Sequence, residues 1–308
     1  MNFDVVALGE AMVEFNQTRP GEPQFLQGFG GDTSNAAIAA SRAGARAAYV
    51  SAVGNDVFGR SLLDLWGREG VDTSGVAAVD GQPTGIYFVT HGKTGHEFSY
   101  RRAGSAASQV LLSTAQLNLI ARSKWLHYSG ISQAISATTR QQCALAVAHA
   151  RSHGVRVSFD SNLRLKLWPL ELARQHMLQA IFSCDLFLPS IDDVTAISGL
   201  ADPQAVLNWA HALGAKQVVL KLGADGAWAS DGTSRTHIAA HQVAAVDATG
   251  AGDCFAGNLL ARLCAGDNLP TATRYANAAA ALAVQGFGAV APLPAADAVR
   301  KFMESHAV

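Results

Sequence analysis

The chain has 308 residues, of which 49% are hydrophobic and 15% are charged, and its formal net charge at pH 7 is -1. This length is enough to bury a full α/β core, as one large domain or as two, and the composition excludes a disordered chain. The sequence has no basic block, so neither nucleic-acid binding nor binding to an anionic membrane is expected.

Apolar runs and helical periodicity alternate along most of the chain. Strands are predicted at residues 5–8, 47–53, 125–129, 155–159, 186–188 and 217–220. Helices are predicted at residues 36–44, 58–66, 141–151, 171–182 and 204–213, with Thr33 or Ser34 as the cap of the first. This alternation predicts an α/β protein with a mostly parallel sheet and helices on both of its faces.

Two segments lie outside the alternation. Residues 11–30 contain several prolines and glycines and are predicted to form short exposed strands and turns. Residues 85–101 are predicted to form a hairpin around a glycine-rich turn at 91–95. We expect the two segments to form a small second sheet. A two-stranded ribbon is only marginally stable alone, so the hairpin is also predicted to pack on that of a second copy, as a dimer.

Cysteine and histidine usage indicates a reducing compartment. The four cysteines, Cys143, Cys184, Cys254 and Cys264, are far apart and form no C-x-x-C pair, and three of them lie in apolar patterns that predict buried free thiols. The ten histidines lack the spacing of zinc ligands. Residues 1–4 are typical of the start of a strand and not of a signal peptide, and no apolar run approaches a membrane span. We therefore expect a cytoplasmic protein without zinc.

The stretch 247–258 has the pattern of an anion-binding turn that leads into a helix. Gly250, Ala251 and Gly252 leave their backbone N–H groups accessible, and the apolar stripe 255–263 predicts a helix that begins near Ala251. Asp253 falls in the first helical turn, where a carboxylate could take a proton from a hydroxyl that attacks a phosphoryl group. The alternative is an acidic residue that only favours the helix dipole.

A second turn precedes the first long helix. The glycines of residues 30–35 permit a tight turn and the close approach of a ligand at Gly31. Asp32 and Asn35 offer hydrogen-bond acceptors and donors suited to hydroxyl groups. The alternative is an ordinary strand-to-helix turn.

Together these stretches resemble the signatures of a known family. Residues 30–35 and 54–59 resemble the N-terminal signature of the PfkB (ribokinase-like) carbohydrate kinases, and residues 247–257 resemble the C-terminal signature. Both occur in order, and the resemblance covers essentially the whole chain. It implies one kinase domain over residues 1–308, a ribokinase-like α/β core, and a small β-sheet lid from about 11–30 and 85–102. It also implies that ATP binds along the C-terminal half and that the sugar lies under the lid.

The resemblance assigns roles to several residues. It makes Asp253 the general base and the amides of 250–252 the anion hole. Residues 221–226 resemble the family's nucleotide loop, which assigns ATP to Lys221, Gly223 and Gly226. A glycine-rich turn after strand 217–220 also lies at the carboxyl end of a strand, where α/β sheets bind ligands. The alternative is a plain hairpin turn. Asn277 is a further candidate on the adenine side.

One departure concerns the metal. The family often has an Asn-x-x-Glu motif that organises Mg²⁺, whereas the corresponding residues here run from Ser190 to Asp193. Asp193 offers an oxygen ligand to a hydrated Mg²⁺, but Ser190 has no carboxamide. The need for a monovalent cation is left open.

Three places in the sequence suggest an acidic sugar. Tyr100 and Arg102 are two apart in a predicted strand, so both are expected on one face, and Tyr87 lies in the partner strand. Arg164 follows the strand 155–159 and is expected to face the lid from the sheet edge. A guanidinium binds a carboxylate in bidentate fashion. The alternative is that these arginines are solvated surface residues.

These motifs resemble 2-dehydro-3-deoxygluconate kinases within the PfkB family. That resemblance implies sugar-acid contacts for Gly31, Asn35, Tyr87, Tyr100, Arg102 and Asp253, and contacts toward the ATP phosphates for Asn162 and Arg164. The leading hypothesis is an ATP- and Mg²⁺-dependent kinase that phosphorylates the terminal hydroxyl of 2-dehydro-3-deoxy-D-gluconate. The rivals are a kinase for a neutral sugar such as fructose or ribose, and a non-catalytic sugar- or nucleotide-binding regulator. An NAD-binding protein is not expected, because no G-x-G-x-x-G follows the first strand.

Overall fold

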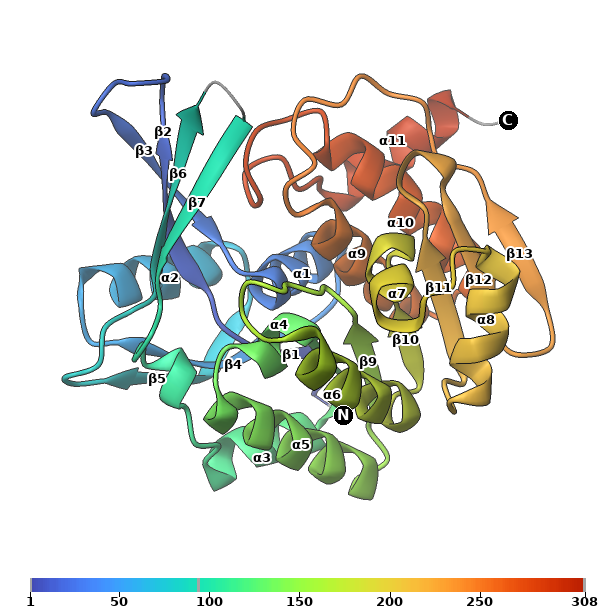
Figure 1. The fold of residues 1–308 in the computed structure, drawn as a ribbon, viewed down its shortest axis with the longest axis horizontal. Helices are drawn as coiled ribbons and strands as arrows, with labels where there is room; N and C mark the ends of the chain where they lie inside the picture. The colour runs from blue at the N-terminus through green and yellow to red at the C-terminus, as the bar shows by residue number, and fades with distance from the viewer. Residues whose placement is uncertain (1, 93–94, 307–308) are drawn as a thin grey trace.

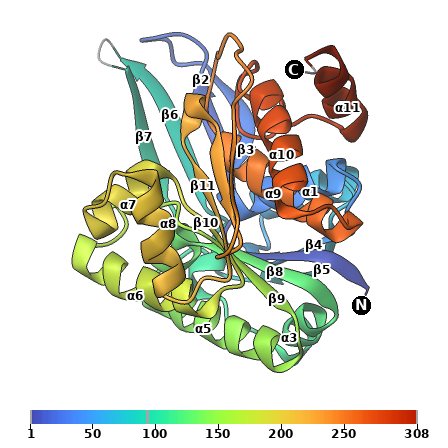
Figure 2. The same cartoon turned by 90° about the vertical axis from the view of Figure 1, so that its right-hand side faces the viewer.

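The computed structural model describes residues 2–92 and 95–306 and is built around a nine-stranded sheet (Figures 1 and 2). The strand order is β13-β12-β11-β10-β9-β8-β1-β4-β5. From β5 to β11 neighbouring strands are parallel, whereas β12 and β13 are antiparallel additions at one edge. The strands are β1 (Phe3–Leu8), β4 (Ala47–Gly54), β5 (Asp72–Val79), β8 (Ser123–Ser129), β9 (Arg156–Asp160), β10 (Leu186–Leu188), β11 (Gln217–Lys221), β12 (Ala227–Ser230) and β13 (Arg235–Ile238).

Helices cover both faces of this sheet, as the β-α alternation predicted (Figure 2). One face carries α1 (Asp32–Arg42), α2 (Val57–Arg68), α9 (Ala251–Ala265), α10 (Leu269–Ala283) and α11 (Ala296–Ser305). The other carries α3 (Thr114–Ala121), α4 (Gly130–Ala134), α5 (Ala137–Ser152), α6 (Leu170–Ser183), α7 (Ile191–Ser198) and α8 (Pro203–Ala212). In the described part of the chain, no helix is long and apolar enough to cross a membrane.

The predicted second sheet has four strands and stands beside the carboxyl edge of the core as the lid (Figure 1). Its order is β3-β2-β6-β7, with β2 (Met12–Gln17), β3 (Phe25–Gly30), β6 (Ile86–Gly92) and β7 (Gly95–Arg101). The β2–β6 pair is parallel, and the other two pairs are antiparallel. The β6–β7 hairpin confirms the prediction, although residues 93 and 94 of the expected turn lie outside the described residues.

The first long helix differs from its prediction at one point. α1 begins at Asp32 with Gly31 at its N-cap and no side-chain cap, so the expected capping by Thr33 or Ser34 is wrong. Gly31 has a φ of 124°, a conformation that glycine adopts freely, and the helix can therefore begin directly after the strand β3. The two hydroxyls are buried instead: that of Thr33 is paired with Tyr49, and that of Ser34 accepts a bond from Trp66 Nε1.

Helices α1 and α9 pack closely because small residues line their contact. A Cβ atom at Gly257 of α9 would lie 2.2 Å from the carbonyl oxygen of Ala36 and 2.7 Å from the Cβ of Ala39. Only glycine fits there, and its lack of a side chain lets the two helix backbones approach closely. This contact fixes the first turn of α9 against the first turn of α1, where the candidate site lies.

Candidate active site

The turn before α9 has the geometry expected of an anion-binding helix start. Gly250 is the N-cap, with a φ of 75°, and its carbonyl accepts the first ladder bond, from Cys254 N–H at 2.8 Å. The N–H groups of Gly252 and Asp253 precede that bond, in the position where helix amides bind anions. The N–H of Ala251 instead donates to Ala248 O at 3.2 Å. The amide of Ala251, which the sequence assigned to the anion hole, is therefore committed to the turn.

Asp253 lies half-buried beside this turn and is bound to the first helix. Asn35 Nδ2 donates to Asp253 Oδ2 at 2.8 Å, which joins α1 to α9 across 218 positions of sequence. Burial, together with the negative charges of Asp32 and Asp160, raises the pKa of Asp253 to about 7, whereas Asn35 and Lys221 oppose this rise. A carboxyl group with a pKa near 7 is suited to accept a proton at neutral pH. Asn35 Oδ1 is buried without a hydrogen-bond partner among the described residues.

At the floor of the site two sequence-predicted residues bond to each other, and one of them also bonds to a carboxylate that was missed. Asn162 Nδ2 donates to Asp32 Oδ2 at 3.0 Å, and the backbone N–H of Asn162 donates to Asp160 Oδ1 at 3.2 Å. The φ of Asn162 is 29°, an uncommon value for a side-chain-bearing residue and typical of functional sites. Asp160 is the last residue of β9, so a carboxylate directly at the end of the buried strand residues 157–159 was the signal that could have identified it.

Asp160 also binds a lysine at the floor of the site. Lys221 Nζ donates to Asp160 Oδ2 at 2.6 Å, and both side chains are mostly buried. Burial raises the pKa of Asp160, and the Lys221 charge opposes this rise. A Cβ atom at Gly252 would lie 3.6 Å from Lys221 Nζ. The Lys221 ammonium group therefore lies directly beside the N-terminal turn of α9.

The rest of the segment 221–226 is the turn of a hairpin between β11 and β12, and its role as a nucleotide loop stays a prediction. Gly223 and Gly226 have φ values of 60° and 88°, and a Cβ atom at Gly226 would lie 2.1 Å from Ile238 O. Asn277 Nδ2 donates to the carbonyls of Ile238 and Ala239, at 3.1 and 3.3 Å. Asn277 thus ties α10 to the end of β13, the strand against which Gly226 packs.

Asp193 and Ser190, the residues at the expected metal position, hold the neighbouring loop. Ser190 caps α7 by accepting the N–H of Asp193 at 3.2 Å, and Asp193 Oδ2 accepts bonds from the Ser161 hydroxyl and the Leu163 N–H, at 2.6 and 3.2 Å. The described residues contain no group of three or more metal-ligating histidine, cysteine or carboxylate side chains. A hydrated Mg²⁺ does not need such a group, because one or two carboxylates and the substrate phosphates suffice. The hard oxygen donors of Asp193 and Asp160 fit that ion.

The lid turns an aromatic face toward Asp253. Tyr87 and Tyr100 are directly opposite each other in the β6–β7 register, and their rings stack with centroids 5.7 Å apart. The Tyr87 hydroxyl donates to Glu14 of β2. Burial raises the pKa of Tyr87, as do the nearby carboxylates of Glu14 and Asp253. Glu14 was missed in the sequence, although the alternation of β2 places it on the same face as Met12 and Asn16.

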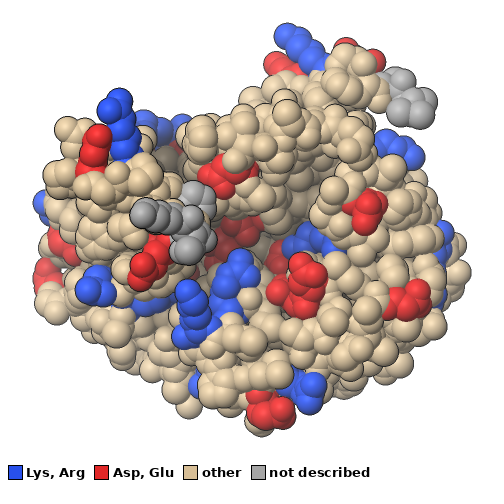
Figure 3. All heavy atoms as spheres, turned by 45° about the horizontal axis from the view of Figure 1, so that its top comes forward, with Lys and Arg blue, Asp and Glu red and all other residues tan. Residues whose placement is uncertain are grey.

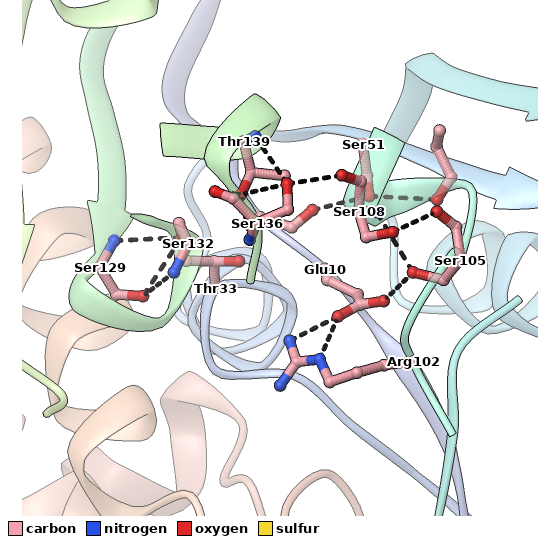
Figure 4. Close-up of polar contacts among 12 residues, drawn as sticks. Glu10, Thr33, Ser51, Arg102, Ser105, Ser108, Ser129, Ser132, Ser136 and Thr139 are labelled. Atoms are coloured by element: carbon pink, nitrogen blue, oxygen red, sulfur yellow. Dashed lines mark hydrogen bonds and ion pairs between the residues drawn. The ribbon is translucent and has the colours of Figure 1, made fainter. Parts of the chain in front are cut away.

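Arg102 approaches this face from the lid hinge. It lies one residue beyond the end of β7, which corrects the expectation that it is part of this strand. Arg102 Nε donates to Glu10 Oε2 at 2.7 Å, and the side chain is only 10% exposed (Figure 4). The Arg102 Cζ atom lies 6.0 Å from the centroid of the Tyr100 ring. The solvated-surface alternative is therefore wrong for Arg102.

Arg164 lies on the opposite side of the cleft and is exposed. Its Nη1 donates to the carbonyl of Leu163 at 2.8 Å. Burial raises the pKa of Tyr100, and the positive charges of Arg102 and Arg164 oppose this rise, so both arginines lie close to the same tyrosine. Figure 3 shows acidic and basic side chains gathered in a hollow between the two parts of the molecule.

The sheet order, the lid and the helix start at Gly250 define a ribokinase-like fold with a polar site at its carboxyl edge. The description of the pfkB family carbohydrate kinases matches residues 2–296, and the chain belongs to this family of sugar phosphotransferases.

Three similar proteins illustrate the range of the family. A 2-dehydro-3-deoxygluconokinase of Thermoproteus tenax is 35% identical over 91% of this chain and 88% of its own length. Fructokinase-1 of Oryza sativa subsp. japonica is 34% identical and covers 98% of each chain. The structure of an Escherichia coli protein assigned to ribokinase II, in complex with ATP and Mg²⁺, has a TM-score of 0.90 at 26% identity and covers 98% of this chain and 99% of its own.

Proposed function

We propose that this sugar kinase transfers the γ-phosphoryl group of ATP to the terminal hydroxyl of a sugar acid, and that 2-dehydro-3-deoxy-D-gluconate is converted to its 6-phosphate. The observation that carries this proposal is the pair of arginines beside Tyr100: Arg102, nearly buried at the lid hinge, and Arg164 across the cleft. A neutral sugar gives no reason for two guanidinium groups over its binding site. The four unpaired cysteines fit a reaction in the cytoplasm.

Asp253 is the proposed general base. In its ionised form it accepts the proton of the terminal hydroxyl as that oxygen attacks the γ-phosphorus. Its place in the first turn of α9 puts the proton acceptor next to the amides of Gly252 and Asp253, where the transferring group would lie. Asn35 fixes the orientation of the carboxylate, because it holds one oxygen and leaves the other for the substrate.

The transferring phosphoryl group requires positive charge around it. The helix amides and Lys221 supply part of it, and Asp160 fixes the lysine in place. Arg164 and Asn162 are proposed to contact the ATP phosphates from the other side, with Gly223, Gly226 and Asn277 on the nucleotide side. Mg²⁺, when bound, neutralises phosphate charge, and Asp193 would hold it through its water shell.

The sugar acid is proposed to lie between α1 and the lid. Asp32 and Asn35 would bind its hydroxyls, and the unpartnered Asn35 Oδ1 is free to accept one such bond. Gly31 allows this turn, since a Cβ atom there would lie 2.4 Å from Glu10 O. Tyr87 and Tyr100 would cover the sugar, while Arg102 and Arg164 bind its carboxylate.

One observation favours a neutral sugar as the second candidate. Glu14 is buried on the lid face that meets the sugar, and Glu10 offsets the charge of Arg102. These two carboxylates reduce the net attraction for an acidic ligand, and a fructokinase is among the similar proteins. A non-catalytic regulator is less well supported, because it has no need for a carboxylate with a raised pKa beside the helix start.

The charge of the substrate is tested with Arg164→Ala. Loss of a charge-assisted hydrogen bond costs on the order of 1.5–3 kcal/mol, so KM for the sugar acid should rise roughly ten- to a hundredfold. The same variant should leave KM for fructose nearly unchanged. Lys166→Ala is the matched control, since it removes an exposed cation two residues away in the same loop. An equal rise in KM for both sugars would contradict the sugar-acid assignment, whereas an equal fall in kcat would follow from the contact of Arg164 with the ATP phosphates.

A further inference from the structure

The side chain of Glu10 is fully buried, although it carries a carboxylate. Glu10 follows β1, a central strand of the main sheet, at the point where the chain first leaves the core for the lid. A charge in such a place is stable only when its partners surround it. Those partners identify what Glu10 does.

The chain passes between core and lid four times, and Glu10 contacts every one of these connections. Glu10 itself lies in the first. The second contains Gly31, where a Cβ atom would lie 2.4 Å from Glu10 O. The third contains Gly85, where a Cβ atom would lie 2.8 Å from Glu10 Oε1. In the fourth, Arg102 and Ser105 bind the carboxylate directly.

The fourth connection is the most tightly bound. Arg102 Nε donates to Glu10 Oε2 at 2.7 Å, and the Ser105 hydroxyl donates to Oε1 at 2.5 Å. Arg102 Nη2 forms an ion pair with the same carboxylate but lacks a hydrogen-bond partner in the described structure. The third guanidinium nitrogen points away from Glu10 (Figure 4). Glu10 therefore sets the direction in which Arg102 presents its remaining donors.

A series of hydrogen bonds connects Ser105 to the N-terminal end of α5 (Figure 4). The Ser108 hydroxyl donates to Ser105 O at 2.7 Å, and the Ser136 hydroxyl donates to Ser108 O at 2.7 Å. Ser136 is the N-cap of α5, a helix of the core. The Ser136 bond, which runs to the backbone carbonyl of Ser108, thus fixes the end of the lid hinge to the core, whereas the Ser108 hydroxyl bonds only within the hinge.

We propose that Glu10 is a positioning residue for the phosphotransfer reaction. It fixes the lid over Asp253 and orients Arg102 toward the sugar site. That Glu10 orients Arg102 toward the sugar rests on the proposed function, whereas that Glu10 fixes the lid does not. Closed lids exclude water from phosphoryl transfer and complete the substrate site. Loosening the hinge should therefore weaken sugar binding and leave nucleotide binding intact.

Glu10→Gln is the direct test, because glutamine keeps the size of the side chain and can still accept the Ser105 bond. Whichever way its amide group turns, glutamine carries no charge, so the ion pair with Arg102 is lost. We expect amide hydrogen exchange in β6 and β7 to accelerate about tenfold or more, while exchange in β1, β8 and β9 is unchanged. KM for the sugar that the wild type uses best should rise at least about fivefold, with KM for ATP within about twofold. ATP hydrolysed per sugar phosphate formed should also rise.

Ser108→Ala is the matched control. It removes a buried hydroxyl bond in the same network without contact to the Glu10 carboxylate. We expect it to lower the melting temperature slightly and to leave lid exchange and KM for the sugar at wild-type values. If Ser108→Ala reproduces the effects of Glu10→Gln, or if Glu10→Gln lowers the melting temperature alone, the positioning role is refuted.

A double-variant cycle keeps the inference testable if single variants fold poorly. Arg102→Met leaves the Glu10 carboxylate buried without its ion-pair partner, and should cause the larger loss in melting temperature. Adding Glu10→Gln to Arg102→Met should restore most of that loss, since the charge is removed with its partner. Additive losses would overturn the coupling. Amide hydrogen exchange and the melting temperature are measured without substrate. They therefore test the role of Glu10 in the lid independently of whether the sugar acid is the substrate.

Discussion

Replacing Asp253 by asparagine is expected to abolish most turnover and, at the same time, to stabilise the folded chain above neutral pH. As a general base Asp253 should contribute at least ~10²-fold to turnover. Its pKa, however, is raised from 3.8 to about 7, chiefly by burial and by the neighbouring Asp32 carboxylate. The ionised side chain is therefore a local source of instability in the folded protein.

The sign and size of this effect follow from the two pKa values. The folded protein binds the Asp253 proton more tightly than the unfolded chain does, so stability falls as pH rises from about 4 to about 7. Above pH 7 the full cost applies, and the rise from 3.8 to about 7 corresponds to about 4 kcal/mol. An asparagine side chain at this position carries no charge and escapes this cost, while its carbonyl oxygen can still accept the bond from Asn35. The catalytic rate of the wild type should also fall as pH drops below about 7, because protonation of Asp253 removes the general base.

Thermal unfolding from pH 5 to pH 8, together with kcat/KM over the accessible part of that range, measures both effects. The melting temperature of Asp253→Asn should exceed that of the wild type by an amount that grows with pH. Asp56→Asn is a control of opposite sign: burial raises the pKa of Asp56, but hydrogen bonds from Thr84 and Gly59 outweigh burial and lower it. That variant should be destabilised at pH 8. An Asp253→Asn variant with near-normal kcat, or with lower stability than wild type at pH 8, would refute the reasoning.

Three further outcomes are expected. Lys221→Met is combined with Asp160→Asn so that no buried carboxylate is left unpaired. This double variant should raise KM for ATP roughly ten- to a hundredfold and leave KM for the sugar nearly unchanged. An unchanged KM for ATP would contradict the phosphate-binding role of Lys221. Gly257→Ala should destabilise the chain by about 1–3 kcal/mol in urea unfolding, because its Cβ would meet the α1 backbone, whereas Gly67→Ala, with open space around it, should not. The lid exposes Phe25 and Leu26, so sedimentation velocity at micromolar concentration should show a dimer; a fully active monomer would count against it.

The order of the core elements was predictable because each depends on residues close together in sequence. The strand 186–188 and the start of α9 at Ala251 were placed at the correct residues from apolar runs and a small-residue turn. The edge strand β5 was missed, since polar residues and a glycine interrupt its sequence, 72–79. The pattern of apolar residues is a weak signal for a strand that is only partly buried.

The site was predictable in its residue types but not in its pairings. Asp253, Asn35 and Asp32 were identified from two turns, and their contact depends on the packing of α1 on α9. Asp160, Glu10 and Glu14 were missed, because nothing in the local sequence indicates that each will bind a cation or a tyrosine far along the chain. Such pairs arise only when the folded sheets bring distant segments of the chain together.

The central proposal is that the kinase acts on a sugar acid, and a direct comparison of substrates tests it most closely. The measurement is kcat/KM of the wild-type enzyme for 2-dehydro-3-deoxy-D-gluconate, fructose and ribose, with ATP and Mg²⁺, and with the phosphorylated position identified in the product. The proposal predicts that 2-dehydro-3-deoxy-D-gluconate is the best substrate by at least about tenfold, which is about 1.4 kcal/mol, and that its 6-phosphate is formed. A higher kcat/KM for fructose or ribose would contradict the proposal and make a neutral sugar the substrate.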